Sequence, residues 1–223
     1  RGLSVAEAAI EAQCAVIGNV GFLGIPMLVL LLGQAAIGPV MMVLAVDLIV
    51  FSSLVVILIT GSRDGRMSFG VLRTVGLGLL KNPMIVSISL GLLVSSMAVP
   101  IPVPVNEFLE ILGGAATPGA LFAIGASLAS KSAERMVIAG WLSFCKLIVH
   151  PAAVAVAALM VFDVDPYAAG VMITAAALPV AGNVYILAQH YGVAPARVSA
   201  TILLSTGLSV LTISAVIAWV TSL

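Results

Sequence analysis

The sequence predicts an all-α membrane protein, and three features carry this prediction. Of the 223 residues, 62% are hydrophobic and only 8% are charged, whereas a soluble domain carries about 25% charged residues. The apolar residues form continuous runs instead of the alternating pattern of a β-barrel. Seven of these runs reach roughly the 20 residues that a helix needs to cross the hydrocarbon core. A soluble fold is therefore excluded, and the zero net charge offers no basic surface for nucleic acid.

We expect seven transmembrane helices, joined by short polar or Pro-rich connections. They lie at residues 10–32, 36–60, 82–99, 107–129, 136–161, 167–190 and 197–220. The longest connection, residues 61–81, is basic and is predicted to run partly as an interfacial amphipathic helix.

Loop charge predicts the orientation, because Lys and Arg are retained on the cytoplasmic side of a membrane. With the N-terminus inside, every loop Lys and Arg falls on the inner side. These residues are Arg1, Arg63, Arg66, Arg73, Lys81, Lys131, Arg135 and Arg197. The remaining cation, Lys146, lies within a span. We expect a multi-pass protein of the cell inner (plasma) membrane, with the N-terminus of this chain cytoplasmic and its C-terminus outside.

Two of the expected spans carry residues that weaken a helix near the middle of the bilayer. The residues are Asn19, Gly24 and Pro26 in span 10–32, and Pro179, Gly182 and Asn183 in span 167–190. Proline removes a backbone donor and clashes with the preceding turn. A single such span is compatible with an ordinary kink, but paired interruptions in two halves point to the midplane site of a transporter. We expect non-helical backbone near residues 24–26 and 179–182, close together in space.

Several motifs also carry a family resemblance. They lie at residues 18–27, 81–83, 117–128, 146–151, 177–192 and 202–209. In order and spacing they resemble the auxin efflux carrier family, whose bacterial members are often named malonate or organic-acid transporters. The resemblance implies ten spans in two inverted five-helix repeats, with the fourth and ninth helices broken and crossing. Residues 1–60 would then end the first repeat, 61–81 would be a cytoplasmic linker and 82–223 the second repeat, with three upstream spans absent from this chain.

The two interrupted spans suggest a binding site. Half-helices that meet would present unpaired N–H groups and positive dipole ends, which suit a carboxylate. Asn19 and Asn183 would add uncharged amide groups, although either could instead cap a half-helix. We therefore predict substrate contacts from the six residues of the two interruptions.

Ionisable residues within spans are costly and usually functional. Asp47 lies near the middle of span 36–60, and Lys146 and His150 share one face of span 136–161. These three are candidates for balancing the charge of an anion or for relaying protons. Alternatively, Lys146 could pair structurally with an acid, and His150 could bond a carbonyl freed near Pro151.

The leading functional hypothesis is a secondary carrier for a small organic acid anion, such as the dicarboxylate malonate, working by alternating access. A membrane channel or a structural membrane subunit is the alternative. An enzyme is not expected, because no catalytic motif is found. We expect no cofactor or metal, a coupling ion of either H⁺ or Na⁺, and partners limited to the organic anion and the lipid bilayer. Homodimer formation is left open.

Overall fold

The computed structural model describes residues 2–64, 73, 77, 80, 83–129 and 136–222. The basic connections expected at residues 61–81 and 130–135 therefore lie largely outside the described residues. Across the described ranges the chain is all-α, without a strand, as the composition predicts. The helices are α1 (Val5–Val16), α2 (Ile25–Leu32), α3 (Ile37–Ala45), α4 (Ser52–Asp64), α6 (Pro83–Ser96), α7 (Val103–Ala129), α8 (Met136–Phe144), α9 (His150–Val156), α10 (Pro166–Ala176), α11 (Gly182–Tyr191) and α12 (Pro195–Val220).

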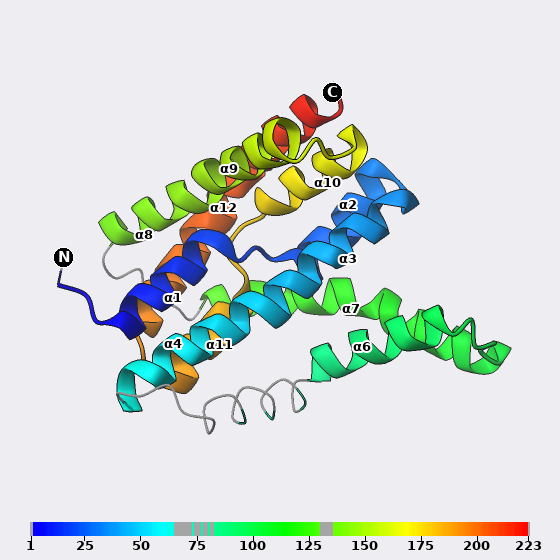
Figure 1. The fold of residues 1–223 in the computed structure, drawn as a ribbon, viewed down its shortest axis with the longest axis horizontal. Helices are drawn as coiled ribbons and strands as arrows, with labels where there is room; N and C mark the ends of the chain where they lie inside the picture. Colours follow the sequence, from blue (N-terminus) through cyan, green and yellow to red (C-terminus); the bar gives the residue numbers. More distant parts are fainter. Residues whose placement is uncertain are drawn as a thin grey trace.

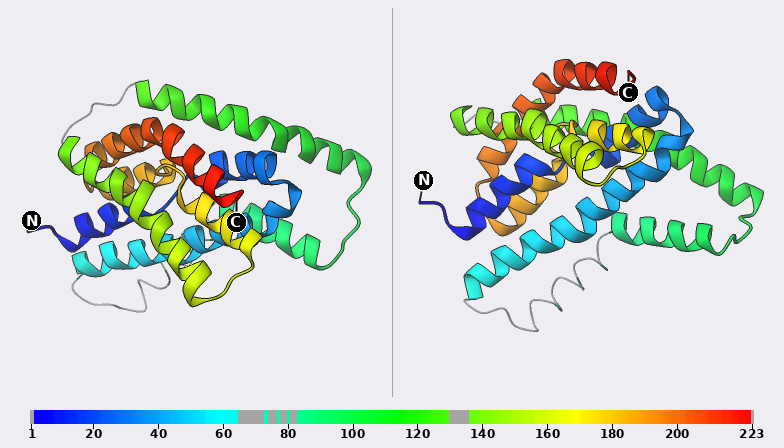
Figure 2. Two further views of the ribbon diagram at one scale, coloured as in Figure 1. Left: turned by 90° about the horizontal axis from the view of Figure 1, so that it is seen from above. Right: turned by 45° about the horizontal axis from the view of Figure 1, so that its top comes forward.

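Short π-helical segments join some of these helices into longer continuous ones. These segments are Val20–Gly24 before α2, Val46–Phe51 between α3 and α4, Cys145–Val149 between α8 and α9, and Ala157–Val161 after α9. Figure 1 shows α1 to α4 packed with α8 to α12. In Figure 1 and in the right-hand view of Figure 2, α6 extends away from this group.

Three helices in the described part of the chain are long and apolar enough to cross a membrane. They are Gln34–Ser62, Met136–Val161 and Pro195–Val220. The shortest of them have 26 residues, or about 39 Å at 1.5 Å per residue, which exceeds the roughly 30 Å of a hydrocarbon core. They correspond to three of the seven expected spans, namely 36–60, 136–161 and 197–220.

The other four expected spans take different forms. Span 82–99 corresponds to α6, which has only 14 residues, and span 107–129 lies within α7, which has 27. Spans 10–32 and 167–190 are each divided into two helices. The proline-rich residues 100–104 explain where α6 stops, because proline cannot continue a helix interior.

Each divided span packs against one half of the other before its interruption and against the other half after it. One hydrophobic cluster joins α1 to α11, through residues such as Ile10, Cys14 and Val184. A second cluster joins α2 to α10, through Leu28 and Val171. The first half of each divided span therefore packs with the second half of the other, so the two spans cross.

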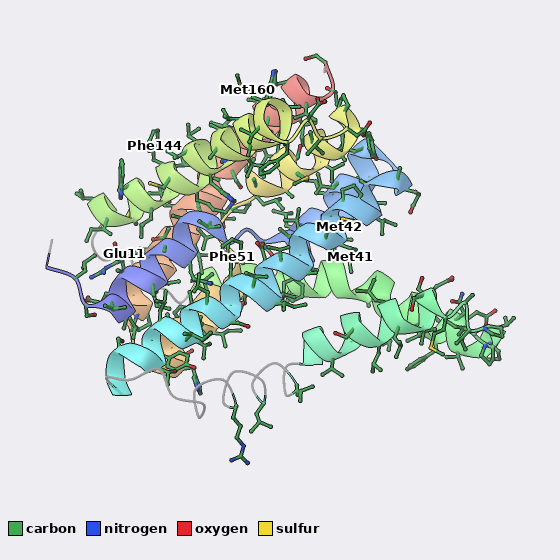
Figure 3. All side chains as sticks on the ribbon, in the orientation of Figure 1. Glu11, Met41, Met42, Phe51, Phe144 and Met160 are labelled. Carbon is green, nitrogen blue, oxygen red and sulfur yellow. The ribbon has the colours of Figure 1, made fainter. Side chains whose placement is uncertain are left out.

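Apolar side chains also cover much of the outer surface. Met42 is 71% exposed and Met160 is 79% exposed, and Figure 3 shows these residues on different helices of the group, together with the exposed Phe144. An apolar exterior of this kind is unfavourable in water but suits the hydrocarbon of a bilayer. The surface therefore agrees with the membrane class that the composition predicts.

An ion pair buried between α1 and α12 was not expected from the sequence. One guanidinium nitrogen of Arg197 lies 2.5 Å from Glu11 and the other lies 3.5 Å from Glu7. Arg197 is 7% exposed and Glu11 is 8% exposed. Arg197, which the sequence analysis counts with the loop cations, therefore lies buried in the first turn of α12. A cation in the first turn of a helix is opposed by the helix dipole, and Glu11 offsets this unfavourable position.

We expect Glu11→Gln to destabilise the protein strongly, because it leaves the buried Arg197 charge without its nearest partner. The loss for breaking a buried ion pair from one side is about 3–5 kcal/mol. Glu7→Gln is the matched control and should have a much smaller effect, since its carboxylate is more distant and more exposed. Thermal unfolding of the purified variants measures both, and equal midpoints for the two variants would contradict this role of Glu11.

Candidate functional site

The candidate site lies where the two interruptions meet. Residues 17–19 and 177–181 are not helical, and Gly18 forms an antiparallel bridge with Val180. The backbone N–H of Asn19 donates to the carbonyl of Pro179 at 2.8 Å, and that of Ala181 donates to Ile17 at 3.2 Å. These two hydrogen bonds satisfy backbone groups that the interruptions remove from the helices. The segments can be followed between α1 and α2, and between α10 and α11, in Figure 1. We call this arrangement the crossing.

The second interruption lies where the sequence predicts it. Pro179 lies between α10 and α11, outside both helices, where its missing N–H leaves no helical hydrogen bond unmade. Its carbonyl is the acceptor for Asn19. Gly182 then begins α11, and Asn183 follows in the first turn of that helix.

The first interruption is displaced from its expected position. The backbone near Gly24 and Pro26 is helical, so the prediction of a break at residues 24–26 is wrong. Pro26 follows the π-helical segment Val20–Gly24 inside the continuous helix Val20–Leu32, where local π-helical adjustment allows a membrane helix to accommodate a proline. The π-helical segment before α2 begins after Asn19, whose carbonyl accepts from the N–H groups of Leu23 and Gly24. The break therefore falls at residues 17–19 and not at the proline.

Two glycines of the first divided span leave room for a side chain of the second divided span. A Cβ added to Gly24 would lie 2.6 Å from Cδ1 of Leu178. A Cβ on Gly18 would lie 3.3 Å from Cβ of Leu178 and 3.2 Å from the carbonyl oxygen of Ala175. Leu178 is fully buried. Gly24 thus contributes close packing to the crossing and does not interrupt the helix.

Ser205 of α12 also supports the crossing, and sequence reasoning missed it. Its hydroxyl accepts from the N–H of Val180 at 3.2 Å and donates to the carbonyl of Ile202 at 3.2 Å. The residue is fully buried. The available signal was the four-residue spacing of Thr201, Ser205 and Ser209, which places three hydroxyls on one face of the helix.

Lys146 is the most deeply buried charged residue among those described, with 0% exposure. Its ammonium donates to the carbonyl of Ala176, the last residue of α10. The preceding carbonyls, those of Ile173, Thr174 and Ala175, already accept from residues 177 and 178. Lys146 therefore satisfies the next carbonyl at the negative end of this half-helix. A Cβ on Gly18 would lie 3.3 Å from the Lys146 nitrogen, so the charge is at the crossing.

His150 lies on the same helical face as Lys146, as its four-residue spacing predicts. Its Nδ1 atom is 3.3 Å from the Lys146 nitrogen and 3.3 Å from the carbonyl oxygen of Ala176. Unlike Lys146, His150 is only partly buried. The carbonyl that His150 contacts is therefore that of Ala176 on another helix, and not the one near Pro151 that the alternative named.

Asp47 lies in the π-helical segment between α3 and α4 and is buried. Its carboxylate is not in ion-pair contact with Lys146, although the two charges attract each other. The structure thus brings Lys146 and His150 to one end of α10, and the Asp47 charge acts on Lys146 without contact. The cation is held there by a backbone carbonyl, and the acid acts on it from a distance.

The crossing also holds two helix N-termini without side-chain caps. Asn19 precedes the helix Val20–Leu32 and makes no capping hydrogen bond through its side chain. The residue before α11, Ala181, has no side chain that could make one. The side-chain oxygen of Asn183 is buried without a hydrogen-bond partner. A Cβ added to Gly182 would meet nothing within 4 Å, so there is open space at the start of α11.

Comparison with known proteins gives two matches. Residues 3–217 match the sequence model of a family described as "Membrane transport protein". A protein of Rhizobium meliloti (strain 1021) named "Putative malonate transporter" is 30% identical over 216 residues, which cover 95% of this chain and 67% of that protein.

We expect Gly18→Ala to destabilise the crossing, because its Cβ would be crowded by Ala175, Leu178 and Lys146. Overpacking of this kind costs about 1–3 kcal/mol. Gly182→Ala is the matched control, since the space around it is open, and it should leave stability within about 0.5 kcal/mol. Thermal unfolding of both variants is the measurement. A Gly18→Ala midpoint as high as that of Gly182→Ala would show that close approach at residue 18 is not needed.

Proposed function

Because the chain belongs to the membrane transport protein family, the auxin efflux carrier family that its motifs resemble, we propose that it is a secondary carrier for a small organic acid anion. The family match and the name of the Rhizobium relative indicate a membrane transporter and not an enzyme. Malonate, which that name contains, is the first candidate substrate, and other dicarboxylates are the next.

The crossing is the observation that carries this proposal. Two helix N-termini without side-chain caps begin there, at Asn19 and at Gly182. The first N–H groups of a helix have no intrahelical partner and favour anions. The side-chain amide of Asn183, whose oxygen has no partner, and the open space beside Gly182 add a polar group and room at one of these ends. In our proposal the substrate carboxylate accepts from the backbone N–H groups and from the side-chain NH2 of Asn183, and Gly24, Pro26 and Pro179 shape the backbone around it.

The nearby charges set the electrostatic conditions of the site. Lys146 places a positive charge at the crossing, and Asp47 offsets part of it. We propose that the ammonium attracts the anion without contacting it directly, since it is fully buried and bonded to Ala176. His150, beside Lys146, is the third ionisable group of the proposed site. The coupling ion is H⁺ or Na⁺.

The proposed architecture extends beyond the three membrane helices described above. In it, this chain supplies seven spans of a ten-helix inverted-repeat fold, with residues 1–60 ending the first repeat, 61–81 as a cytoplasmic linker and 82–223 forming the second repeat. Transport would follow alternating access, in which the remaining helices move relative to the crossing. The protein would lie in the inner (plasma) membrane, and assembly as a homodimer is part of the same proposal.

The binding site is tested with Asn183→Ala in the purified full-length protein. We expect the affinity for the best-bound carboxylate in a thermal-shift screen to fall at least tenfold, which is about 1.4 kcal/mol. Asn106→Ala is the control, because Asn106 is an exposed asparagine of α7 whose side chain bonds Glu110 on the same helix. Unchanged affinity in Asn183→Ala would remove this residue from the site.

The carrier mechanism is tested separately by uptake into proteoliposomes. A carrier gives saturable uptake of labelled malonate or of another bound acid, and uptake is faster when the vesicles already contain the same acid. Ohmic conductance without this acceleration would contradict a carrier and favour a channel.

The proposed orientation predicts labelling of single cysteines in cells. Cys14 and Cys145 are first replaced by alanine to remove the native thiols. A membrane-impermeant thiol reagent added from outside should modify Val103→Cys, at the exposed start of α7. It should spare Ser132→Cys, a position outside the described residues, until the membrane is permeabilised. The reverse labelling pattern would invert the orientation.

A further inference from the structure

We propose that Lys146 and His150 share the proton that is coupled to transport, so that the coupling ion is H⁺ and not Na⁺. This inference rests on the carrier proposed above. It is carried by the triangle formed by the Lys146 nitrogen, His150 Nδ1 and the carbonyl oxygen of Ala176.

The triangle keeps its hydrogen bonds in either protonation state. When Lys146 is an ammonium, it donates to the Ala176 carbonyl and to the lone pair of His150 Nδ1. When Lys146 is a neutral amine, an amine N–H still donates to Ala176, and a protonated Nδ1 can donate to the same carbonyl. Loss of the proton therefore leaves no buried carbonyl unsatisfied, which would otherwise be destabilising.

The path of the proton follows from the two ring nitrogens of histidine. The ammonium transfers H⁺ to His150 Nδ1, which gives a neutral amine and an imidazolium. The imidazolium then releases the proton on Nε2, which leaves a neutral ring protonated on Nδ1. One proton has left, and one positive charge has been removed from the crossing. Lys146 has no exposure of its own, whereas His150 is partly exposed, so the imidazole is the more accessible member of the pair.

The charges that face the pair favour this exchange. From the neighbouring elements, Asp47 is the ionisable group that acts on Lys146, and His150 is on the same helix as Lys146. With the anion absent, Asp47 balances the ammonium. A bound carboxylate adds negative charge near the crossing and so favours retention of the proton on the pair. Release of the anion removes this stabilisation, and the proton can then leave.

The same geometry disfavours sodium. The carbonyl that ends α10 is already bonded to the Lys146 ammonium. A sodium ion there would have to displace this ammonium and would meet its positive charge at short range. A proton needs no additional ligands, since the amine and the imidazole both accept it.

The test measures anion and proton movement together in proteoliposomes that contain the full-length protein. Uptake is followed with labelled malonate, or with the acid that binds best if malonate is not taken up, and internal pH is followed with a trapped dye. We expect proton movement in a fixed ratio to the anion, and we expect uptake to be unchanged when choline replaces sodium. His150→Gln should lower the number of protons moved per anion at least tenfold, because the amide cannot carry a proton from one nitrogen to another.

His190→Gln is the matched control, because His190 is the protein's second histidine and lies exposed at the end of α11. It should keep the wild-type ratio. A second variant, Lys146→Arg, retains the positive charge but does not release its proton, so it too should lower the ratio. Thermal unfolding identifies variants that fail to fold. If a variant fails, the proton ratio and the sodium replacement measured on the wild-type protein still test the proposal.

The outcomes separate this inference from the proposed function. Saturable uptake that moves no protons, requires sodium, or keeps its proton ratio in His150→Gln overturns the proton inference and leaves the carrier intact. Absence of uptake for every carboxylate that binds overturns the carrier, and the inference with it.

Discussion

The antiparallel pairing of Gly18 with Val180 is the constraint on which the rest of the structure depends. An interrupted helix in hydrocarbon leaves backbone groups without water, at several kcal/mol for each unsatisfied group. Here two interruptions satisfy each other, since Asn19 donates to Pro179 and Ala181 donates to Ile17. Each interruption therefore supplies hydrogen-bond partners for the other. The exchange of partners between α1, α2, α10 and α11, and the two helix N-termini between them, follow from this pairing.

The two buried sites of positive charge are built in opposite ways. Arg197 is in direct contact with Glu11, and a guanidinium does not lose its proton in a protein. This pair is a fixed connection between α1 and α12. Lys146 is held by a carbonyl and an imidazole, and its acid, Asp47, stays out of contact. A lysine responds to its surroundings by changing protonation far more readily than an arginine. The first site suits a static role, and the second suits a role that changes during transport.

The sequence predicts the all-α membrane class, the second interruption and the shared face of Lys146 and His150, because each depends on local composition or spacing. It places the first interruption wrongly, because a helix can accommodate a proline in its interior by local π-helical adjustment, as Val20–Leu32 does at Pro26. Arg197 looks like a loop cation because its partner is 186 residues away in sequence. Ser205 is missed because a hydroxyl in a membrane helix usually bonds its own backbone. Residues whose role depends on distant contacts are the ones that sequence alone does not assign.

The crossing is held together by a small number of hydrogen bonds. Two backbone hydrogen bonds and the hydroxyl of Ser205 join the interrupted segments to their surroundings, and each such bond contributes about 0.5–1.5 kcal/mol net. Because Gly18 and Gly24 have no side chains, the two segments approach closely around Leu178. No long side chains interlock at these two positions. A junction held in this way is specific in geometry but weak enough to adjust when a charge enters or leaves beside it. This ability to adjust links the backbone pairing to Lys146. A change in the protonation of Lys146 would act directly on the carbonyl of Ala176, which ends α10.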